Sequence, residues 1–157
     1  MVKAIRFDKT GGPEVMKWLD VDVGDPGAGE VRIKQHAVGL NYIDVYFRNG
    51  LYPLPLPGAL GMEAAGEVVA VGEGVTQLKA GDRVAYAARP PGAYTQERVI
   101  PAEKLVKIPD AIGYDEAASV MLQGLTAQYL CRDSCAVRPG DWAVVHAAAG
   151  GVGLLLA

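Results

Sequence analysis

The sequence predicts a mainly β chain with an α/β end, in which a compact barrel of short strands is followed by a strand and helix of a parallel sheet. Three observations predict this. Short alternating or apolar runs, separated by glycine and proline turns, fill the first hundred residues. After about Asp110 the chain becomes rich in Ala, Leu, Met and Gln, which favour helix. Near the C-terminus a continuous apolar run leads directly into a glycine cluster.

Six strands are expected in the barrel, each a short run with strand-like alternation or apolar character, bounded by turn residues. The expected strands are Val2–Phe7, Val15–Val21, Glu30–Val38, Glu67–Val71, Arg83–Ala87 and Tyr94–Ile100. Alternation within the third strand predicts two faces. One face carries Val31, Ile33, Gln35 and Ala37, and the other carries Arg32, Lys34 and His36.

A short helix is expected to follow the third strand. Asn41 is a favoured N-terminal cap, Asp44 follows three residues later, and Asn49-Gly50 is a typical helix end. The next segment, Leu51–Pro57, carries three prolines and is expected to be a loop.

Two helices, Asp115–Leu122 and Leu125–Cys135, are expected to meet at Gly124. Beyond a turn, Trp142–Ala147 is a continuous apolar run, typical of a strand buried on both faces of a parallel sheet. These patterns divide the chain into a barrel domain, 1–124, and a second part, 125–157, that holds a linking helix and the start of an α/β domain.

Glycines follow the apolar run at once, in Ala148-Ala149-Gly150-Gly151-Val152-Gly153. Between a buried strand and a helix, Gly150 lets the backbone approach a pyrophosphate and Gly153 lets the helix pack closely. Ala148 stands where G-x-G-x-x-G has its first glycine. The turn predicts a dinucleotide site at Gly150, Gly151 and Val152, with an ordinary strand-to-helix turn as the alternative.

The same residues predict that the chain is the front part of a longer oxidoreductase. Only four or five residues follow the glycines, fewer than the ~12 that an isolated helix needs for marginal stability. A single parallel strand has no partner for its hydrogen bonds. The acidic or basic residue expected ~20 positions further on, which separates NAD from NADP, lies outside this sequence.

Composition excludes several classes of protein. Half of the residues are hydrophobic and 21% are charged, as in a globular protein. The net charge of -3 provides no basic face for nucleic acid. No apolar run approaches the ~20 residues of a membrane span, and the N-terminus is not a signal peptide, so a cytoplasmic protein is expected. Cys131 and Cys135 are interpreted as ordinary helix residues.

Five segments, in this order, carry a resemblance that covers the whole chain. They are Gly11–Val15, Gly39–Asp44, Gly50–Pro53, Gly61–Gly66 and His146–Gly153. With them the chain resembles the zinc-free quinone oxidoreductase (zeta-crystallin-like) branch of the medium-chain dehydrogenase/reductase superfamily, and bacterial NADPH:quinone oxidoreductases in particular. The resemblance implies a GroES-like β-barrel catalytic domain, followed by the first βα element of a Rossmann fold.

The resemblance also implies roles for particular residues, each beside a structural alternative. Tyr46 and Tyr52 would donate hydrogen bonds to a substrate oxygen as catalytic groups; alternatively, Tyr46 packs on the short helix and Tyr52 on the proline loop. The nicotinamide end of NADPH would be lined by Asn41, Tyr42, Ile43, Asp44, Val45 and Tyr46. Asn41 and Asp44 can also simply cap the helix. Thr126 and Tyr129 would lie beside the cofactor, or are exposed or half-buried helix residues.

No metal site is expected. Zinc-dependent relatives place a cysteine where Asn41 stands and a histidine where Met62 stands, and neither Asn nor Met is a normal zinc ligand. The cysteine-rich lobe that holds their structural zinc is missing. His36 and His146 are interpreted as structural, with no evident partner.

The predicted function of the parent protein is zinc-independent reduction of quinones by hydride transfer from NADPH, in a homodimer without nucleic-acid or membrane partners. One alternative is a zinc-free enone or alkenal reductase. Another is a non-catalytic GroES-like or crystallin-like module. The glycine turn favours an enzyme, because a co-chaperonin has no use for it.

Overall fold

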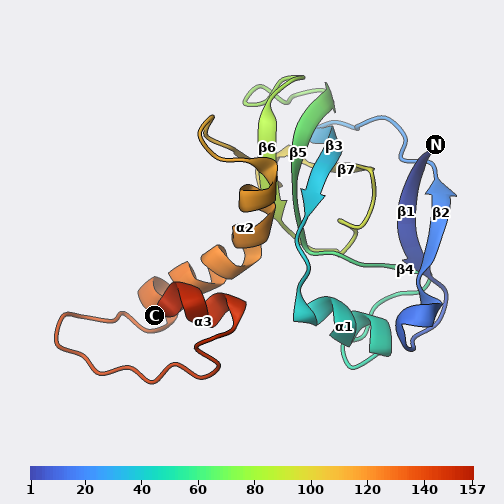
Figure 1. Cartoon of the computed structure of the whole chain (residues 1–157). Coiled ribbons are helices and arrows are strands. Elements are labelled where there is room, and N and C mark those ends of the chain that lie inside the picture. Colours follow the sequence, from blue (N-terminus) through green and yellow to red (C-terminus); the bar gives the residue numbers. More distant parts are fainter.

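The computed structural model describes all residues, Met1–Ala157, and shows two antiparallel sheets with three α-helices (Figure 1). The three-stranded sheet has the order β2 (Lys17–Val21), β1 (Val2–Phe7), β4 (Gly58–Ala59). The five-stranded sheet has the order β7 (Glu97–Pro101), β3 (Glu30–Val38), β5 (Glu63–Val71), β6 (Arg83–Ala87), β8 (Val106–Lys107). The helices are α1 (Tyr42–Asn49), α2 (Tyr114–Tyr129) and α3 (Gly151–Leu156).

The pairing of β3 with β5 forms the centre of the larger sheet. Two register shifts interrupt it, between Arg32 and Ile33 and between Gln35 and Ala37. Such bulges bend a strand and increase its twist, which helps the sheet to curve. An isolated bridge between Ala4 of β1 and Thr95 links the smaller sheet to the segment just before β7. The predicted mainly β, barrel-type fold is confirmed.

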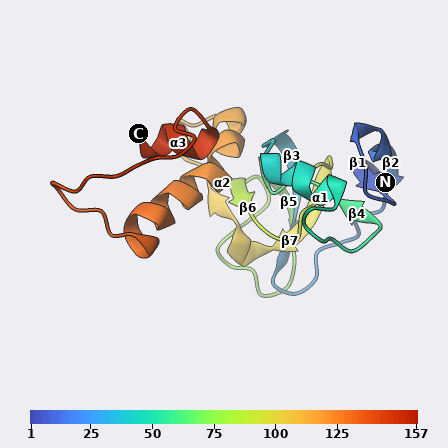
Figure 2. The same ribbon diagram turned by 90° about the horizontal axis from the view of Figure 1, so that it is seen from below.

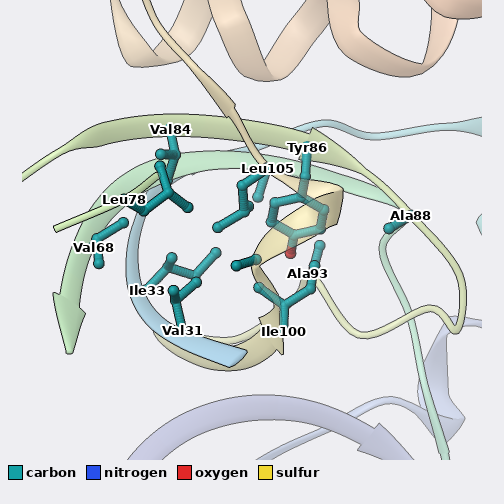
Figure 3. Packing of buried hydrophobic residues seen from close by; sticks show 12 residues of the cluster. Val31, Ile33, Val68, Leu78, Val84, Tyr86, Ala88, Ala93, Ile100 and Leu105 are labelled. Carbon is teal, nitrogen blue, oxygen red and sulfur yellow. The ribbon is translucent and has the colours of Figure 1, made fainter. Parts of the chain in front are cut away.

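The main core lies inside the larger sheet, where side chains from β3, β5, β6 and β7 meet (Figure 3). The two predicted faces of β3 are as expected, because Val31 and Ile33 are fully buried while Lys34 and His36 are exposed. His36 nevertheless has a partner that the sequence did not reveal. Its ring stacks on that of Tyr114, with 4.4 Å between the centroids.

Two smaller clusters attach the helices to the sheets. Under α1 lie five buried side chains, Phe7, Val15, Phe47, Leu60 and Met62. Under the start of α2 the buried residues are mostly alanines, including Ala65 and Ala85 from the sheet and Ala117 and Ala118 from the helix. Small side chains on both surfaces let the helix backbone approach the sheet closely.

The helix α1 begins and ends where it was expected. Asn41 is its extended N-cap, and Gly50 ends it at φ 86, in the left-handed region that glycine enters without a steric penalty. Strand boundaries differ more. β5 begins at Glu63, four residues before the expected start, and β7 begins at Glu97 rather than Tyr94.

The two helices expected on either side of Gly124 are one continuous helix, α2, so that prediction is wrong. A Cβ at Gly124 would meet nothing within 4 Å, so the glycine serves no close approach. Glycine costs a helix about 1 kcal/mol relative to alanine, which is too little to break one whose other residues pack well. The helix passes into a π-helical turn, Leu130–Ser134, before it ends.

The strand predicted at Trp142–Ala147 does not form in this chain. The Trp142 side chain is fully exposed, Val144 is 86% exposed, and Ala147 has a φ of 54, which no strand adopts. No strand of the chain runs beside the segment, and a parallel strand needs neighbours for its hydrogen bonds. The segment extends away from the rest of the chain in both views, whereas α3 forms directly after Gly150, as expected, and lies beside α2 (Figures 1 and 2).

None of the three α-helices has both the length and the apolar character that a membrane crossing requires.

Candidate active site

The carboxylate of Asp44 holds the start of α1 in place. It is only 3% exposed and accepts three hydrogen bonds. The donors are the Asn41 backbone N–H at 3.1 Å, the Gly61 backbone N–H at 3.0 Å and the Tyr94 hydroxyl at 2.8 Å. Asp44 therefore caps α1, which was the structural alternative to a role at the cofactor. It also connects the helix to the turn before β5.

Asn41 uses its side chain for a different contact. Its Nδ2 donates to Oε1 of Glu63 at 2.6 Å, and the other oxygen of Glu63 accepts the backbone N–H of Leu122, in α2, at 2.7 Å. Glu63 is fully buried. A buried carboxylate is stable only where hydrogen bonds replace its hydration, and here one donor comes from the N-cap of α1 and the other from α2. Glu63 thus connects α1 to α2.

The residues expected beside the cofactor on α2 lie next to this contact. The Thr126 hydroxyl donates to the Leu122 carbonyl at 2.7 Å, one turn after the residue that Glu63 binds. Gly151, at the start of α3, lies directly against the Gln123 side chain, because a Cβ there would clash with it. The structure therefore places Asn41, Thr126 and the glycine turn in one connected region. Tyr129 lies at the end of α2 and is 45% exposed.

A recess of about 210 Å³ opens beside Glu63, between the end of β3 and α2. Gly39 and Leu40 line it from the barrel, and Ser119 and Gln123 line it from the helix. It therefore reaches from the buried carboxylate to the side chain that packs on Gly151.

The two candidate catalytic tyrosines lie together. The ring centroids of Tyr46 and Tyr52 are 5.2 Å apart, and the Tyr42 ring centroid also lies 5.2 Å from that of Tyr46. Unlike the hydroxyls of Tyr86 and Tyr94, those of Tyr46 and Tyr52 donate to no protein group. The structural alternatives and the catalytic role are compatible, because the rings pack while the hydroxyls stay free. Ile43 and Val45 are half-buried on the same helix.

Sequence reasoning did not assign a role to Glu63 or Tyr94. The only available signal was a glutamate in the otherwise apolar run Gly61–Gly66, since a charged residue in such a run must be paired or solvated. For Tyr94 no local pattern pointed to Asp44, which lies fifty residues earlier in the chain.

Burial raises the pKa of Tyr94, and the neighbouring Asp44 carboxylate raises it further. The folded chain therefore holds this proton at a pH where the unfolded chain, with an ordinary value of 10.0, has lost it. The stabilisation that comes from this raised pKa is complete below pH 10.0. It is lost as the pH rises from there towards the higher pKa of the folded chain. We expect the free energy of unfolding to fall more steeply above pH 10 in the wild type than in Tyr94→Phe. Parallel curves from urea denaturation would contradict this.

Asn41 and Met62 occupy positions that do not favour zinc. The amide of Asn41 is engaged by Glu63, and the Met62 side chain is buried among Phe7, Phe47 and Leu60. Thioether and amide groups are not normal ligands of catalytic zinc, which needs three protein ligands and an open position. We predict less than stoichiometric zinc in dialysed protein by elemental analysis. One zinc per chain would overturn this prediction.

A family model described as the alcohol dehydrogenase GroES-like domain matches residues 27–110. This range contains the strands β3 to β8, the whole Asp44 network and Glu63, whereas Leu122, the α2 partner of Glu63, lies beyond it. The barrel and its site thus define a domain of the GroES-like class. The chain belongs to the alcohol dehydrogenase GroES-like domain family, within the medium-chain dehydrogenase/reductase superfamily.

Similar proteins include quinone oxidoreductases. A quinone oxidoreductase of Pseudomonas aeruginosa is 55% identical over 155 residues, which are 98% of this chain and 48% of that protein. The crystal structure of Escherichia coli quinone oxidoreductase complexed with NADPH matches with a TM-score of 0.94 and 46% identity, over 98% of this chain and 48% of that one. A 2-haloacrylate reductase of Burkholderia sp is 46% identical over 99% of this chain and 49% of its own length. The predicted resemblance is confirmed, and the chain spans about half the length of these relatives.

Proposed function

We propose that this chain is the barrel half of an NADPH-dependent quinone oxidoreductase. The observation that carries the proposal is the pair of free phenol hydroxyls, Tyr46 and Tyr52, together with the region that joins Asn41, Thr126 and Gly151. Similarity to quinone oxidoreductases, one of which was crystallised with NADPH, supports this assignment. NADPH supplies the hydride when it is bound, and the chain's residues bind and orient the reactants.

Tyr46 and Tyr52 are the proposed catalytic residues. Hydride addition leaves negative charge on a quinone oxygen, and a donor already in place stabilises that charge more than water does. Their packed rings fix the two hydroxyls without occupying them. A quinone is already electrophilic and needs no further activation. The rest of the rate enhancement therefore comes from the distance and orientation at which the quinone and the nicotinamide are held.

The nicotinamide end of the cofactor is proposed to lie along Asn41, Tyr42, Ile43, Asp44, Val45 and Tyr46. The Asp44 and Glu63 hydrogen bonds hold the start of this stretch in a single position. The hydrogen bond from Nδ2 of Asn41 to Glu63 fixes the orientation of the Asn41 amide at this end of the site.

The rest of the cofactor is proposed to contact Thr126 and Tyr129 and the backbone at Gly150, Gly151 and Val152. We retain the division into a catalytic barrel, 1–124, and a second part, 125–157, that opens the NADPH-binding domain. A cytoplasmic homodimer that acts on a small-molecule quinone remains the proposal for the full-length protein.

Gly151→Asp is expected to weaken NADPH binding by the full-length protein. The new side chain would clash with Gln123 and place a negative charge beside the pyrophosphate. We expect a loss of about 2 kcal/mol or more, as for a lost charge-assisted contact. Ala28→Asp is the matched control, because it adds the same charge at an exposed turn before β3. An unchanged dissociation constant in a fluorescence titration of Gly151→Asp would exclude this placement.

A second candidate function is the reduction of activated alkenes. The similar 2-haloacrylate reductase favours it, because the same hydride and the same hydrogen-bond donors could serve an alkene conjugated to a carboxyl or carbonyl group. Oxidation of NADPH, followed by absorbance in the full-length protein, distinguishes the two. We expect a larger kcat/KM for 1,4-benzoquinone than for 2-chloroacrylate or methyl vinyl ketone. The reverse order would support the alkene reductase, and no oxidation with any of them would support a non-catalytic module.

A further inference from the structure

A second groove lies away from the candidate active site, on the side of the barrel formed by β1, β2 and β4. Its volume is about 250 Å³, and its walls come from β1, the end of β2, β4 and the start of β7. The helices α2 and α3 lie on the opposite side of the molecule (Figures 1 and 2). Two arginines line this groove, Arg6 from β1 and Arg98 from β7.

Arg98 is held rigidly. One guanidinium nitrogen donates to the Pro90 carbonyl at 2.7 Å and another to the Tyr86 hydroxyl at 3.3 Å, while Cζ lies 5.4 Å from the centre of the Tyr86 ring. The flat group also packs on Gly92, where a Cβ would stand 3.5 Å from Cζ. The guanidinium is therefore fixed in place before any ligand arrives, so little rotamer entropy would be lost on binding.

Arg6 is half-buried and makes one hydrogen bond through its guanidinium, to the Ile5 carbonyl at 2.8 Å. Burial lowers the pKa of Arg6, and the positive charge of Arg98 lowers it further. Two like charges are thus held close together in a partly desolvated groove. Each guanidinium has five N–H donors, so most of the donors of this pair are not used by the protein.

Neither Arg6 nor Arg98 forms an ion pair, although two carboxylates line the same groove. Glu97 is engaged by Arg32, whose Nε lies 2.6 Å from Oε2. Asp22 is exposed, and its Oδ1 accepts the Gly24 backbone N–H at 3.2 Å. With Glu97 neutralised by Arg32, the charged groups facing the groove leave one net positive charge.

We propose that this groove binds a small oxyanion, a phosphate or carboxylate group, between Arg6 and Arg98. Guanidinium groups recognise both of these anions through paired, parallel hydrogen bonds. A bound anion offsets the repulsion between the two arginines and uses their free donors. This site is separate from the residues proposed for NADPH and quinone, and it does not depend on the proposed function.

Calorimetric titration of the 157-residue chain tests the proposal, with inorganic phosphate and acetate as probes and sodium chloride added to constant ionic strength. We expect saturable binding of at least one of the two anions, and the stronger one identifies the ligand class. Arg6→Gln should weaken binding at least about tenfold, as should Arg98→Lys, which keeps the charge but loses the planar fork. The exposed Asp22→Asn should tighten it, because it removes the opposing negative charge.

Arg132→Gln, an exposed arginine outside the groove, is the matched control and should leave the affinity unchanged. Far-ultraviolet circular dichroism confirms that each variant is folded. If neither anion saturates, or if Arg6→Gln and Arg98→Lys both bind as the wild type does, the anion site is wrong.

Discussion

Glu63→Ala should lower the free energy of unfolding by about 3 kcal/mol, because it removes a buried carboxylate and leaves two partly buried donors without an acceptor. The donors are the Asn41 amide and the Leu122 backbone N–H, both within 2.7 Å of the carboxylate oxygens. Glu63→Gln keeps the size but presents an amide to two donors, so at least one hydrogen bond is lost. Urea denaturation measures each loss.

Glu67→Ala is the matched control, because Glu67 lies on the same strand but is only half-buried. Its substitution should change the free energy of unfolding by less than about 1 kcal/mol. Equal losses of unfolding free energy in the Glu63 and Glu67 variants would show that the Glu63 contact between α1 and α2 does not stabilise the fold specifically.

The 157-residue chain by itself is expected to show no measurable oxidation of NADPH with 1,4-benzoquinone. Positioning is worth about 7–11 kcal/mol in such reactions, and this requires the cofactor to be held along its whole length. Here Gly150 and Gly151 are exposed, and the segment Trp142–Ala147 forms no strand. The barrel is expected to fold nonetheless, because its core is complete within the chain.

The same chain should self-associate. Leu154 and Leu155 are 68% and 48% exposed, and Trp142 is fully exposed. Apolar side chains exposed to water favour association, because association removes their surface from water. Light scattering on protein of confirmed mass provides the measurement, and rapid turnover by a monomer would contradict the division of the chain into domains.

The sequence alone predicted the parts of the fold that depend on local patterns. Alternation in Glu30–Val38 gave both faces of β3, and Asn41 with Gly50 gave both ends of α1. The boundaries of β5 were missed because Glu63–Gly66 is made of small residues and a glutamate, which have little strand preference of their own. Pairing with β3 and β6 decides their conformation.

The contacts that build the site could not be predicted from local patterns. Asp44 meets Tyr94, and Glu63 meets Leu122, across more than forty residues of chain. The prediction at Trp142–Ala147 failed for a related reason, since the conformation of a buried strand depends on neighbours that an apolar run cannot specify. The resemblance suggested that Tyr46 and Tyr52 act on a substrate. The structure shows that their rings lie close together.

The most direct test of the central claim is steady-state oxidation of NADPH with 1,4-benzoquinone by the full-length protein and its Tyr46→Phe, Tyr52→Phe double variant. Phenylalanine keeps the packed rings and removes both hydroxyls. We expect quinone-dependent turnover in the wild type and a fall in kcat of about 100-fold in the variant, as for a lost oxyanion donor. A wild type that does not oxidise NADPH, or a variant with unchanged kcat, would contradict the proposal.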